Sequence, residues 1–357
     1  MLTAPIEGKW LTCFRRAFAM SGIGDGTLVA VLSETLSRAV NVKLAELALV
    51  DLGARVFHLA LPSPPQSDPV PVRSTGASQA LQRNVAVIRA LSACEIIIDC
   101  TVEGLLHAPE TPELLAAGTR IFMISNEHPE ILERLMPDSG LQPRVAAALE
   151  LLRNARQMHV TSDAGTDLAI DVAGAPVRGN AGYLDPASKV AYWPGGLCLC
   201  FPKAGTVNGT LVMAPGDANL TFKRYLERPI RLTVERDYVT AVAGDGLDAE
   251  LMRSYIAAWG ERDAYAVSHV GWGMNPRARW DALAMYDKAD VNGTELRAFA
   301  GNFLYSTGAN ETAGRFTRGH FDLPLRNCTI TLDNRLVVER GRLLPPLCES
   351  DAAPSPP

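Results

Sequence analysis

The first half of the chain alternates short apolar runs with segments whose apolar residues recur every three or four positions. The runs predict strands and the amphipathic segments predict helices, in the order strand 27–33, helix 35–52, strand 55–60, helix 77–93, strand 95–100, helix 111–117, strand 120–125 and helix 142–156. Strands that alternate with helices in this way are typical of a mostly parallel sheet covered by helices on both faces.

The pattern changes near His159, where short strands follow one another through tight turns. Two hairpins are predicted, one around Arg236-Asp237 and one around Asp333-Asn334, and a single helix is expected at 249–259. We therefore expect an α/β plus β-rich fold, in which an N-terminal α/β domain packs on a C-terminal β-rich (α+β) domain.

The predicted boundaries follow this change of pattern. The α/β domain is expected to span 1–160 and the β-rich domain 161–348, and the tail 349–357 is expected to be disordered. The connection at 61–78 is rich in proline, which lacks the backbone N–H that hydrogen bonds in helices and sheets require. A connection of this kind is either a functional loop or a disordered one, and the sequence leaves both interpretations open.

Composition narrows the class of protein. The chain has 357 residues, of which 47% are hydrophobic and 20% charged, and a formal net charge of −5. It has no basic stripe of the kind that binds nucleic acid and no run of about eighteen apolar residues that would span a membrane. Charged residues between Glu7 and Arg16 interrupt any secretory signal, and the seven scattered cysteines are typical of reduced thiols, so a cytoplasmic protein is expected.

Two short motifs are interpreted as structural. SGIGDG (21–26) precedes its strand and lacks the G-x-G-x-x-G spacing of a dinucleotide site, so it predicts a turn. Cys198 and Cys200 have no second cysteine pair to complete a zinc ribbon, and alternate positions on a strand are the better interpretation.

His320 and Asp322 form an H-x-D motif at the entry to a predicted strand. Residues two apart on a strand project from the same face, so the imidazole and the carboxylate point together. An exposed His–Asp pair without a ligand is the alternative interpretation.

His269 lies in a segment crowded with glycine and tryptophan, SHVGWGMNPRARW (268–280). The glycines permit close backbone approach, and Trp272 and Trp280 are candidates for the walls of a flat pocket. The alternative is a loop histidine packed on tryptophan. Two histidines and one carboxylate are the ligand set of a non-haem Fe(II) centre, whereas a structural zinc requires a fourth ligand; spacing alone leaves iron as one option among several.

His107 follows the predicted strand 95–100, in LLHAPE (105–110). Loops at the carboxyl ends of parallel strands bind ligands, and a histidine there can act as a general base. The alternative is a residue at the start of a helix before Pro109. The other three histidines are expected to be structural, with His58 in the core or at a sheet edge, His128 at a helix start and His159 in a similar setting.

Several segments together resemble the 2,5-dihydroxypyridine 5,6-dioxygenase family, whose members open a pyridine ring in bacterial nicotinate and nicotine breakdown. The resemblance runs from about residue 80 to 340 and is densest in LLHAPE, GTLVMAPGD (209–217), SHVGWGMNPRARW, GNFLYSTG (301–308) and HFDLPLRNC (320–328). It implies a fold related to the thermophilic metalloaminopeptidases. It also implies a mononuclear Fe(II) site with His269, His320 and Asp322 as ligands and His107 as catalytic base.

The chain departs from the family at two positions: Asn180 and Tyr192 stand where the family carries a glutamate and a histidine that face the site. Trp272, Trp280 and Phe303 are expected to line the ring pocket. Arg277 or Arg326 is expected to hold an anionic group, with a structural salt bridge as the alternative for both.

These expectations describe an Fe(II)-dependent, extradiol-type ring-cleaving dioxygenase. Its partners are a small N-heteroaromatic substrate, 2,5-dihydroxypyridine or a close relative, and O₂, and the chain is expected to form a homo-oligomer. Two alternatives stay open: a metalloaminopeptidase-like hydrolase, which requires two bridged metals and further carboxylates, and a metal-binding homologue without activity.

Overall fold

A computed structural model describes residues 5–65, 67–69 and 77–348. The chain forms two compact units. Unit 1 comprises Met1–Asp138, Asn180–Gly195 and Ala284–Glu295, and unit 2 comprises Ser139–Gly179, Gly196–Leu283 and Leu296–Pro357. The predicted tail 349–357 and part of the proline-rich connection, residues 66 and 70–76, lie outside the described residues.

Unit 1 is built on a parallel five-stranded sheet. Its strands, in spatial order, are β2 (Arg55–Leu61), β1 (Leu28–Glu34), β3 (Ile96–Asp99), β4 (Arg120–Ile124) and β8 (Val190–Trp193). Each adjacent pair runs parallel, which confirms the expected sheet type.

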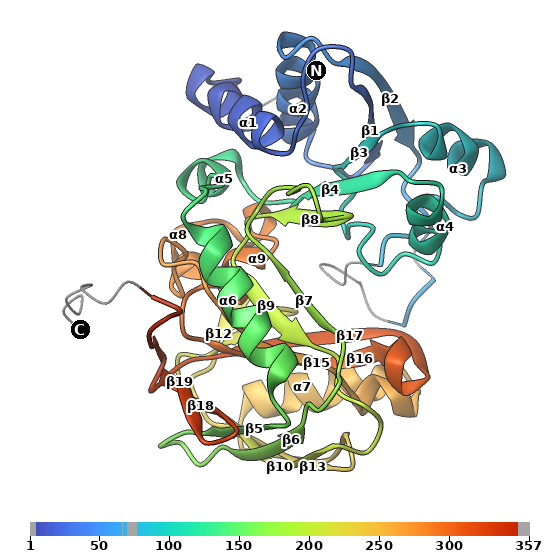
Figure 1. Ribbon diagram of the computed structural model, residues 1–357. Helices are drawn as coiled ribbons and strands as arrows, with labels where there is room; N and C mark the ends of the chain where they lie inside the picture. The colour runs from blue at the N-terminus through green and yellow to red at the C-terminus, as the bar shows by residue number, and fades with distance from the viewer. Residues whose placement is uncertain (1–4, 66, 70–76, 349–357) are drawn as a thin grey trace. The chain divides into compact units, whose positions relative to one another are not determined.

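Helices cover both faces of this sheet, because alternate residues of its strands enter two different cores. Val29 and Val31 pack with α1 and α2, whereas Ala30 and Leu32 pack with α3 and α4. Figure 1 shows these two helix pairs on opposite sides of β1 and β3. The helices assigned to this unit are α1 (Gly8–Met20), α2 (Ala39–Asp51), α3 (Val85–Ser92), α4 (Thr111–Ala116) and α5 (Pro129–Arg134), with a short 3₁₀ turn, η2 (Lys288–Asp290).

Two helix predictions are too long at their starts. The helix expected at 35–52 begins at Ala39, and the helix expected at 77–93 begins at Val85. Asn84 is the N-cap of α3, and its side chain accepts from the backbone N–H groups of Ala86 and Val87. The residues just before it, Gln82 and Arg83, have positive φ, which an α-helix does not adopt. The helix therefore begins only after them, although the helical spacing of apolar residues starts earlier in the sequence.

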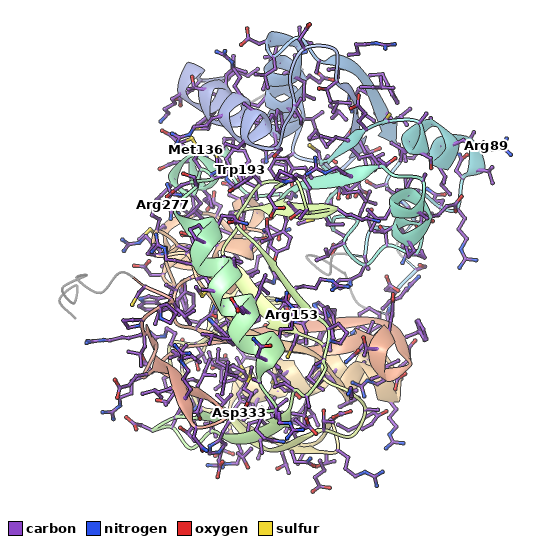
Figure 2. All side chains as sticks on the ribbon, viewed as in Figure 1. Arg89, Met136, Arg153, Trp193, Arg277 and Asp333 are labelled. Atoms are coloured by element: carbon purple, nitrogen blue, oxygen red, sulfur yellow. The ribbon has the colours of Figure 1, made fainter. Side chains whose placement is uncertain are left out.

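The division between the units differs from the predicted boundary at residue 160. Strand β8 pairs in parallel with β4 of unit 1. The segment Asn180–Gly195 therefore belongs to unit 1, although its residue numbers fall in the predicted β-rich domain. The last residue of β8, Trp193, is fully buried in the unit 1 core, against which Met136 packs (Figure 2). A short apolar strand carries no local sign of which sheet it joins, and this is why the pattern assigned it to the wrong unit.

Unit 2 contains an eight-stranded sheet that includes both predicted hairpins. In spatial order its strands are β14 (Tyr238–Ala243), β13 (Ile230–Glu235), β10 (Val207–Met213), β6 (Asp167–Asp171), β5 (Gln157–Thr161), β18 (Thr329–Leu332), β19 (Arg335–Glu339) and β20 (Arg342–Leu343). Both residues of each predicted turn, Arg236-Asp237 and Asp333-Asn334, have positive φ, as tight two-residue hairpin turns require. Both hairpins are therefore confirmed.

A second sheet of unit 2 has five strands. They are, in order, β17 (Arg315–Leu325), β16 (Phe303–Asn310), β15 (Val267–Gly273), β9 (Leu197–Cys200) and β7 (Val177–Asn180). Cys198 and Cys200 occupy alternate positions on β9 and are both buried, as the strand interpretation of C-x-C expected.

The remaining elements are α6 (Leu141–Asn154), β11 (Ala218–Asn219), β12 (Arg224–Tyr225), α7 (Leu247–Ala258), η1 (Arg262–Tyr265), α8 (Ala282–Met285), α9 (Thr294–Ala298) and η3 (Glu311–Ala313). None of the helices within the described ranges has the length and apolar character that a membrane span needs.

Candidate metal centre

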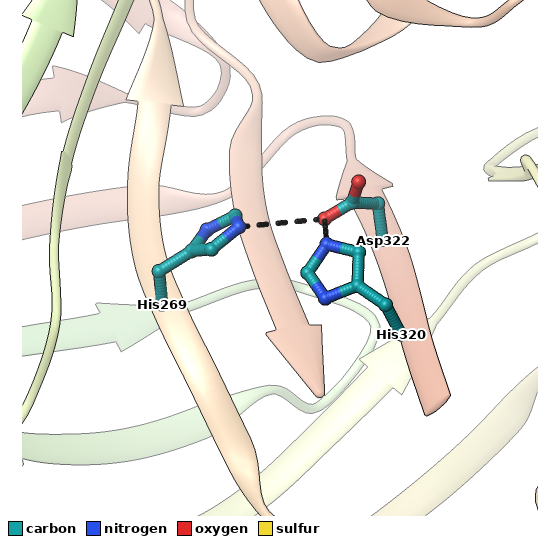
Figure 3. Close-up of side chains that lie close together, drawn as sticks. All are labelled: His269, His320 and Asp322. Carbon is teal, nitrogen blue, oxygen red and sulfur yellow. Dashed lines mark ion pairs between the residues drawn. The ribbon is translucent and has the colours of Figure 1, made fainter. Parts of the chain in front are cut away.

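Three strands of the five-stranded sheet in unit 2 bring His269, His320 and Asp322 together. His269 lies on β15, His320 and Asp322 lie on β17, and β16 runs between them. Cross-strand pairing sets Gly308 of β16 opposite His320, and Ser306 opposite Asp322. Figure 3 shows the three side chains pointing toward one another from these strands.

The ligating atoms converge in a buried space. His320 Nε2 lies 3.2 Å from Asp322 Oδ1, and His269 Nε2 lies 3.7 Å from the same oxygen. One ligating atom from each residue lies within 4.8 Å of the other two, and among the residues that the structure describes no other group of His, Cys, Asp or Glu converges in this way. His269 and Asp322 are each 6% exposed.

Asp322 is held from both sides. Arg297 Nε donates to Oδ2 at 2.5 Å, and the Ser306 hydroxyl donates to Oδ1. Burial by itself raises the pKa of Asp322, but the charge of Arg297, followed by the charge and hydrogen bond of His320, outweighs burial and holds the pKa well below its usual value. The side chain is therefore an ionised carboxylate, the form that binds a metal.

The three residues fit a divalent metal ion. Two imidazoles and one carboxylate on one side of an ion form a facial triad and leave other positions open to ligands. With metal–ligand bonds of about 2.1 Å, adjacent ligand atoms of an octahedron lie roughly 3 Å apart. The observed separation of 3.2 Å between His320 Nε2 and Asp322 Oδ1 is close to that value.

Gly271 shows why glycine accompanies His269. A Cβ at Gly271 would lie 2.0 Å from the carbonyl oxygen of Cys198 on the neighbouring strand β9. Only glycine lets β15 and β9 approach this closely, as the sequence predicted for the glycines beside His269. His269 itself lies on this fully buried strand and not in a loop.

The sheet register corrects the expected ring-pocket role of Trp272 and Phe303. Trp272 pairs with Phe303 across β15 and β16, and both are completely buried. Successive residues of a strand face opposite sides of the sheet. Phe303 is three residues from Ser306 on the regular strand β16, so the Trp272–Phe303 pair lies on the face away from Ser306 and its partner Asp322. The residues around His269 are apolar or aromatic at nearly every position, so their sequence does not indicate which face of the sheet a given side chain occupies.

Trp280 and Arg326 pack against each other on the surface of unit 2. The Arg326 guanidinium lies 4.0 Å from the Trp280 ring centre, and its backbone N–H donates to Asp217. Arg326 also forms an ion pair with Asp217, so the structural interpretation of Arg326 is the one that the contacts support. Arg277 is exposed in the segment after β15, where its backbone N–H donates to Asn275 Oδ1.

The other three predicted site residues, His107, Asn180 and Tyr192, belong to unit 1. His107 lies in the loop after β3, as expected, and is partly buried. The Asn180 side chain bonds to two backbone groups: its Nδ2 donates to the carbonyl of Tyr192 at 2.7 Å, and its Oδ1 accepts from the N–H of Gly182. Both ends of the amide therefore serve the local fold.

Three residues around the triad were missed by sequence reasoning. Arg297 and Ser306 hold Asp322, and the Phe201 ring packs edge-on against His269 with ring centres 5.6 Å apart. A signal existed for Ser306, because it lies in the segment GNFLYSTG that carries the family resemblance. Nothing in the segments of Arg297 or Phe201 separates them from other partly buried residues.

Comparisons with known proteins agree on one family. A model of the family 2,5-dihydroxypyridine 5,6-dioxygenase (NicX) matches residues 9–345. The chain is 37% identical over 347 residues to a 2,5-dihydroxypyridine 5,6-dioxygenase of Pseudomonas putida, which covers 96% of this chain and 98% of that protein.

Solved structures give the same relation. The structure of 2,5-dihydroxypyridine dioxygenase from Pseudomonas putida KT2440 matches with a TM-score of 0.90 and 36% identity, over 96% of this chain and 99% of that one. The aminopeptidase AmpT from Thermus thermophilus matches with a TM-score of 0.61 over 94% of this chain and 99% of its own length. At 14% identity the second match concerns the fold alone, and it confirms the expected relation to metalloaminopeptidases.

Proposed function

This chain belongs to the 2,5-dihydroxypyridine 5,6-dioxygenase family, and on that premise we propose that it is a mononuclear non-haem Fe(II) dioxygenase that opens the ring of 2,5-dihydroxypyridine or a closely related hydroxylated N-heteroaromatic with O₂. The observation that carries the proposal is the convergence of His269, His320 and Asp322 on one face of one sheet. We place its activity in pyridine and nicotinate catabolism in the cytoplasm, and propose that the chain works as a homo-oligomer.

The proposed metal ligands are His269, His320 and Asp322. When bound, Fe(II) supplies the one-electron chemistry that lets ground-state O₂ react with a closed-shell ring. Arg297 and Ser306 orient the Asp322 carboxylate, because each of its oxygens accepts from one of them. Phe201 limits the position of the His269 ring by packing against it.

The proposed substrate contacts are fewer than the sequence implied. Trp272 and Phe303 are left out, because they lie on the opposite face of the sheet from the triad. Tyr192 and Arg277 are kept as candidates, the first for a hydrogen bond to the ring and the second for an anionic oxygen. Asn180 is also kept as a candidate, because its two backbone hydrogen bonds leave one amide hydrogen and one lone pair of Oδ1 for a ligand.

We propose His107 as the general base that removes a proton from a ring hydroxyl and makes the ring electron-rich. The family resemblance and its position in the loop after β3 support this role. His107→Ala is expected to leave the iron content unchanged and to lower turnover by about 10²–10⁴-fold, the usual contribution of a positioned acid–base group. If His107→Ala lowers only the melting temperature and keeps its turnover per folded molecule, His107 has a structural role.

Anaerobic reconstitution with Fe(II), followed by O₂ uptake over a panel of dihydroxypyridines, tests the proposed function. We expect one iron per chain and uptake with 2,5-dihydroxypyridine or a near relative, and Asp322→Asn should lose both metal and uptake. His159→Gln is the matched control, because His159 pairs with Asp167 at the surface of unit 2. Two metal ions per chain with peptidase activity would favour the hydrolase alternative, and substoichiometric metal would favour a homologue without activity.

A further inference from the structure

Unit 1 contains a hydrogen-bonded chain of three polar side chains that the proposed dioxygenase reaction does not use. Ser33 Oγ lies 2.6 Å from His58 Nε2, and His58 Nδ1 lies 2.8 Å from Glu46 Oε1. The three residues come from consecutive elements, Ser33 from β1, Glu46 from α2 and His58 from β2. The sequence predicts only a structural histidine at position 58, in the core or at a sheet edge, and β2 is the edge strand of its sheet.

The partners determine where the protons lie. A carboxylate only accepts, so His58 Nδ1 carries the hydrogen that points to Glu46. Nε2 of the neutral ring is then an acceptor, and the Ser33 hydroxyl donates to it. The second oxygen of Glu46 lies 3.0 Å from Lys43 Nζ, which holds the carboxylate in place. A nucleophile bonded to a base, with the base oriented by a third group, is the arrangement that activates serine hydroxyls.

The three side chains line a cavity of about 290 Å³ that Ala39, Val42 and Lys43 also line. It lies at the carboxyl end of β1, beside the middle of β2, and ligands of open α/β sheets bind at the carboxyl ends of parallel strands. Its volume is at the small end of ligand pockets, which suits a short acyl group. Ser33 is 4% exposed and lines this cavity, through which a substrate would reach its hydroxyl.

The wall of the cavity also offers stabilisation for a developing negative charge. Ala39 is the first residue of α2, and the first-turn N–H groups of a helix have no acceptor within the helix. The N–H groups of Asn41 and Val42 donate to the carbonyl of Arg38, which leaves those of Ala39 and Val40 as the groups that would stabilise the oxygen of a carbonyl attacked from Ser33. The Lys43 ammonium, which lines the cavity and bonds Glu46, would add a positive charge there.

We infer that Ser33, His58 and Glu46 form a second, metal-independent site that hydrolyses small carboxylic esters. Ser33 Oγ attacks the carbonyl carbon while His58 Nε2 takes the hydroxyl proton. The ester C–O bond breaks, His58 returns the proton to the departing alcohol, and the acyl group stays on Ser33. Water then attacks the acyl carbon with His58 as base, which releases the carboxylic acid and restores the serine hydroxyl.

The reaction converts an ester and water into an acid and an alcohol, and it consumes no oxidant or metal. Ester hydrolysis should therefore survive treatment with a chelator, which removes the metal that the proposed dioxygenase needs. The Asp322→Asn variant should likewise keep ester hydrolysis, because Asp322 belongs to unit 2 and the three residues belong to unit 1.

Pre-steady-state hydrolysis of 4-nitrophenyl acetate by the full chain tests the inference. We expect a burst of about one nitrophenol per chain and covalent labelling of Ser33 by a fluorophosphonate, located by peptide mapping. Ser33→Ala should abolish burst and label. His58→Gln and Glu46→Gln should slow acylation by about 10²–10⁴-fold.

Two variants serve as matched controls. His159→Gln removes a histidine that pairs with a carboxylate but, among the residues that the structure describes, with no serine. Ser63→Ala removes a hydroxyl that accepts from the backbone N–H of Leu36, close in sequence to Ser33. Both should keep the burst. An absent burst in the wild type, a label on another residue, or an unchanged burst in Ser33→Ala would each overturn the inference. If Ser33→Ala does not fold, the wild-type label position and the His58→Gln rate decide the question.

Discussion

At the scale of single residues, Asp322 determines the charge of the candidate metal centre. It is the one anionic group among the three proposed ligands, and Arg297 neutralises it from the side opposite the histidines. A metal ion bound to Oδ1 would share the carboxylate with Arg297, which donates to Oδ2. Arg297 is therefore a proposed positioning residue for the metal.

Arg297→Gln is expected to weaken Co(II) or Fe(II) binding by about 10–100-fold, the usual effect of losing a partner that orients a ligand. Anaerobic Co(II) titration followed by visible absorption measures the affinity. Arg326→Gln is the matched control, because it also removes an arginine from a buried aspartate, Asp217, without touching the triad. Equal affinities in Arg297→Gln and the wild type would remove Arg297 from the centre.

Asp99, at the end of β3, is expected to make stability depend on pH. Burial raises the pKa of Asp99 from 3.8 to about 6, against the hydrogen bonds from Thr101 and Leu105 that lower it. The folded state therefore holds a proton that the unfolded state has released, and the free energy of unfolding falls as pH rises from about 4 to about 6. The loss amounts to about 3 kcal/mol, at 1.4 kcal/mol per pH unit, and is complete above that range.

Urea unfolding at intervals between pH 4 and pH 7.5 measures this loss. In Asp99→Asn the decline attributable to this group should be absent, so the difference in unfolding free energy between wild type and variant should change steadily from pH 4 to 6 and stay constant above. A constant difference over the whole range would contradict the assignment.

At the scale of elements, strand β15 joins the proposed ligand His269 to both neighbouring strands. It pairs with β16 on one side and β9 on the other, and all seven of its residues are buried. Side-chain volume on this strand is therefore limited by neighbouring backbone as well as by neighbouring side chains.

Gly271→Ala is expected to destabilise the protein by about 2 kcal/mol or more and to reduce metal binding, because its Cβ would lie 2.0 Å from the Cys198 carbonyl oxygen. Thermal unfolding and Co(II) titration measure the two effects. Gly24→Ala is the control, since a Cβ at Gly24 meets nothing within 4 Å and its φ is not positive. Equal melting temperatures of Gly271→Ala and Gly24→Ala would refute the predicted clash.

At the scale of the whole molecule, the proposed metal ligands and the proposed ester site belong to different units. All three proposed metal ligands lie in unit 2, and the Ser33 site lies in unit 1. A ligand that binds only the folded state stabilises the elements that hold it.

Binding of Co(II) should therefore slow amide hydrogen exchange first in β15, β16 and β17, with β1 to β4 unchanged. Exchange measured by mass spectrometry on peptides covers both units in one experiment, and His269→Ala supplies the control in which added Co(II) has no effect. Protection confined to β1 to β4 would show that the metal binds elsewhere.

The sequence alone determined those features that depend on neighbours along the chain. The alternation of strands and helices predicted the parallel sheet, paired turn residues predicted both hairpins, and the two-residue spacing of His320 and Asp322 predicted that they share a face. Each follows from backbone geometry within a few residues.

Tertiary structure alone decided what depends on pairing between distant segments. It placed His269 beside His320 across β16, returned β8 to the sheet of unit 1, turned Trp272 away from the triad and set Arg297 against Asp322. The same kind of pairing aligned Ser33, Glu46 and His58. Strand order and register arise from the packing of the whole sheet, and a shift of one residue would exchange its two faces, so no local pattern contains this information.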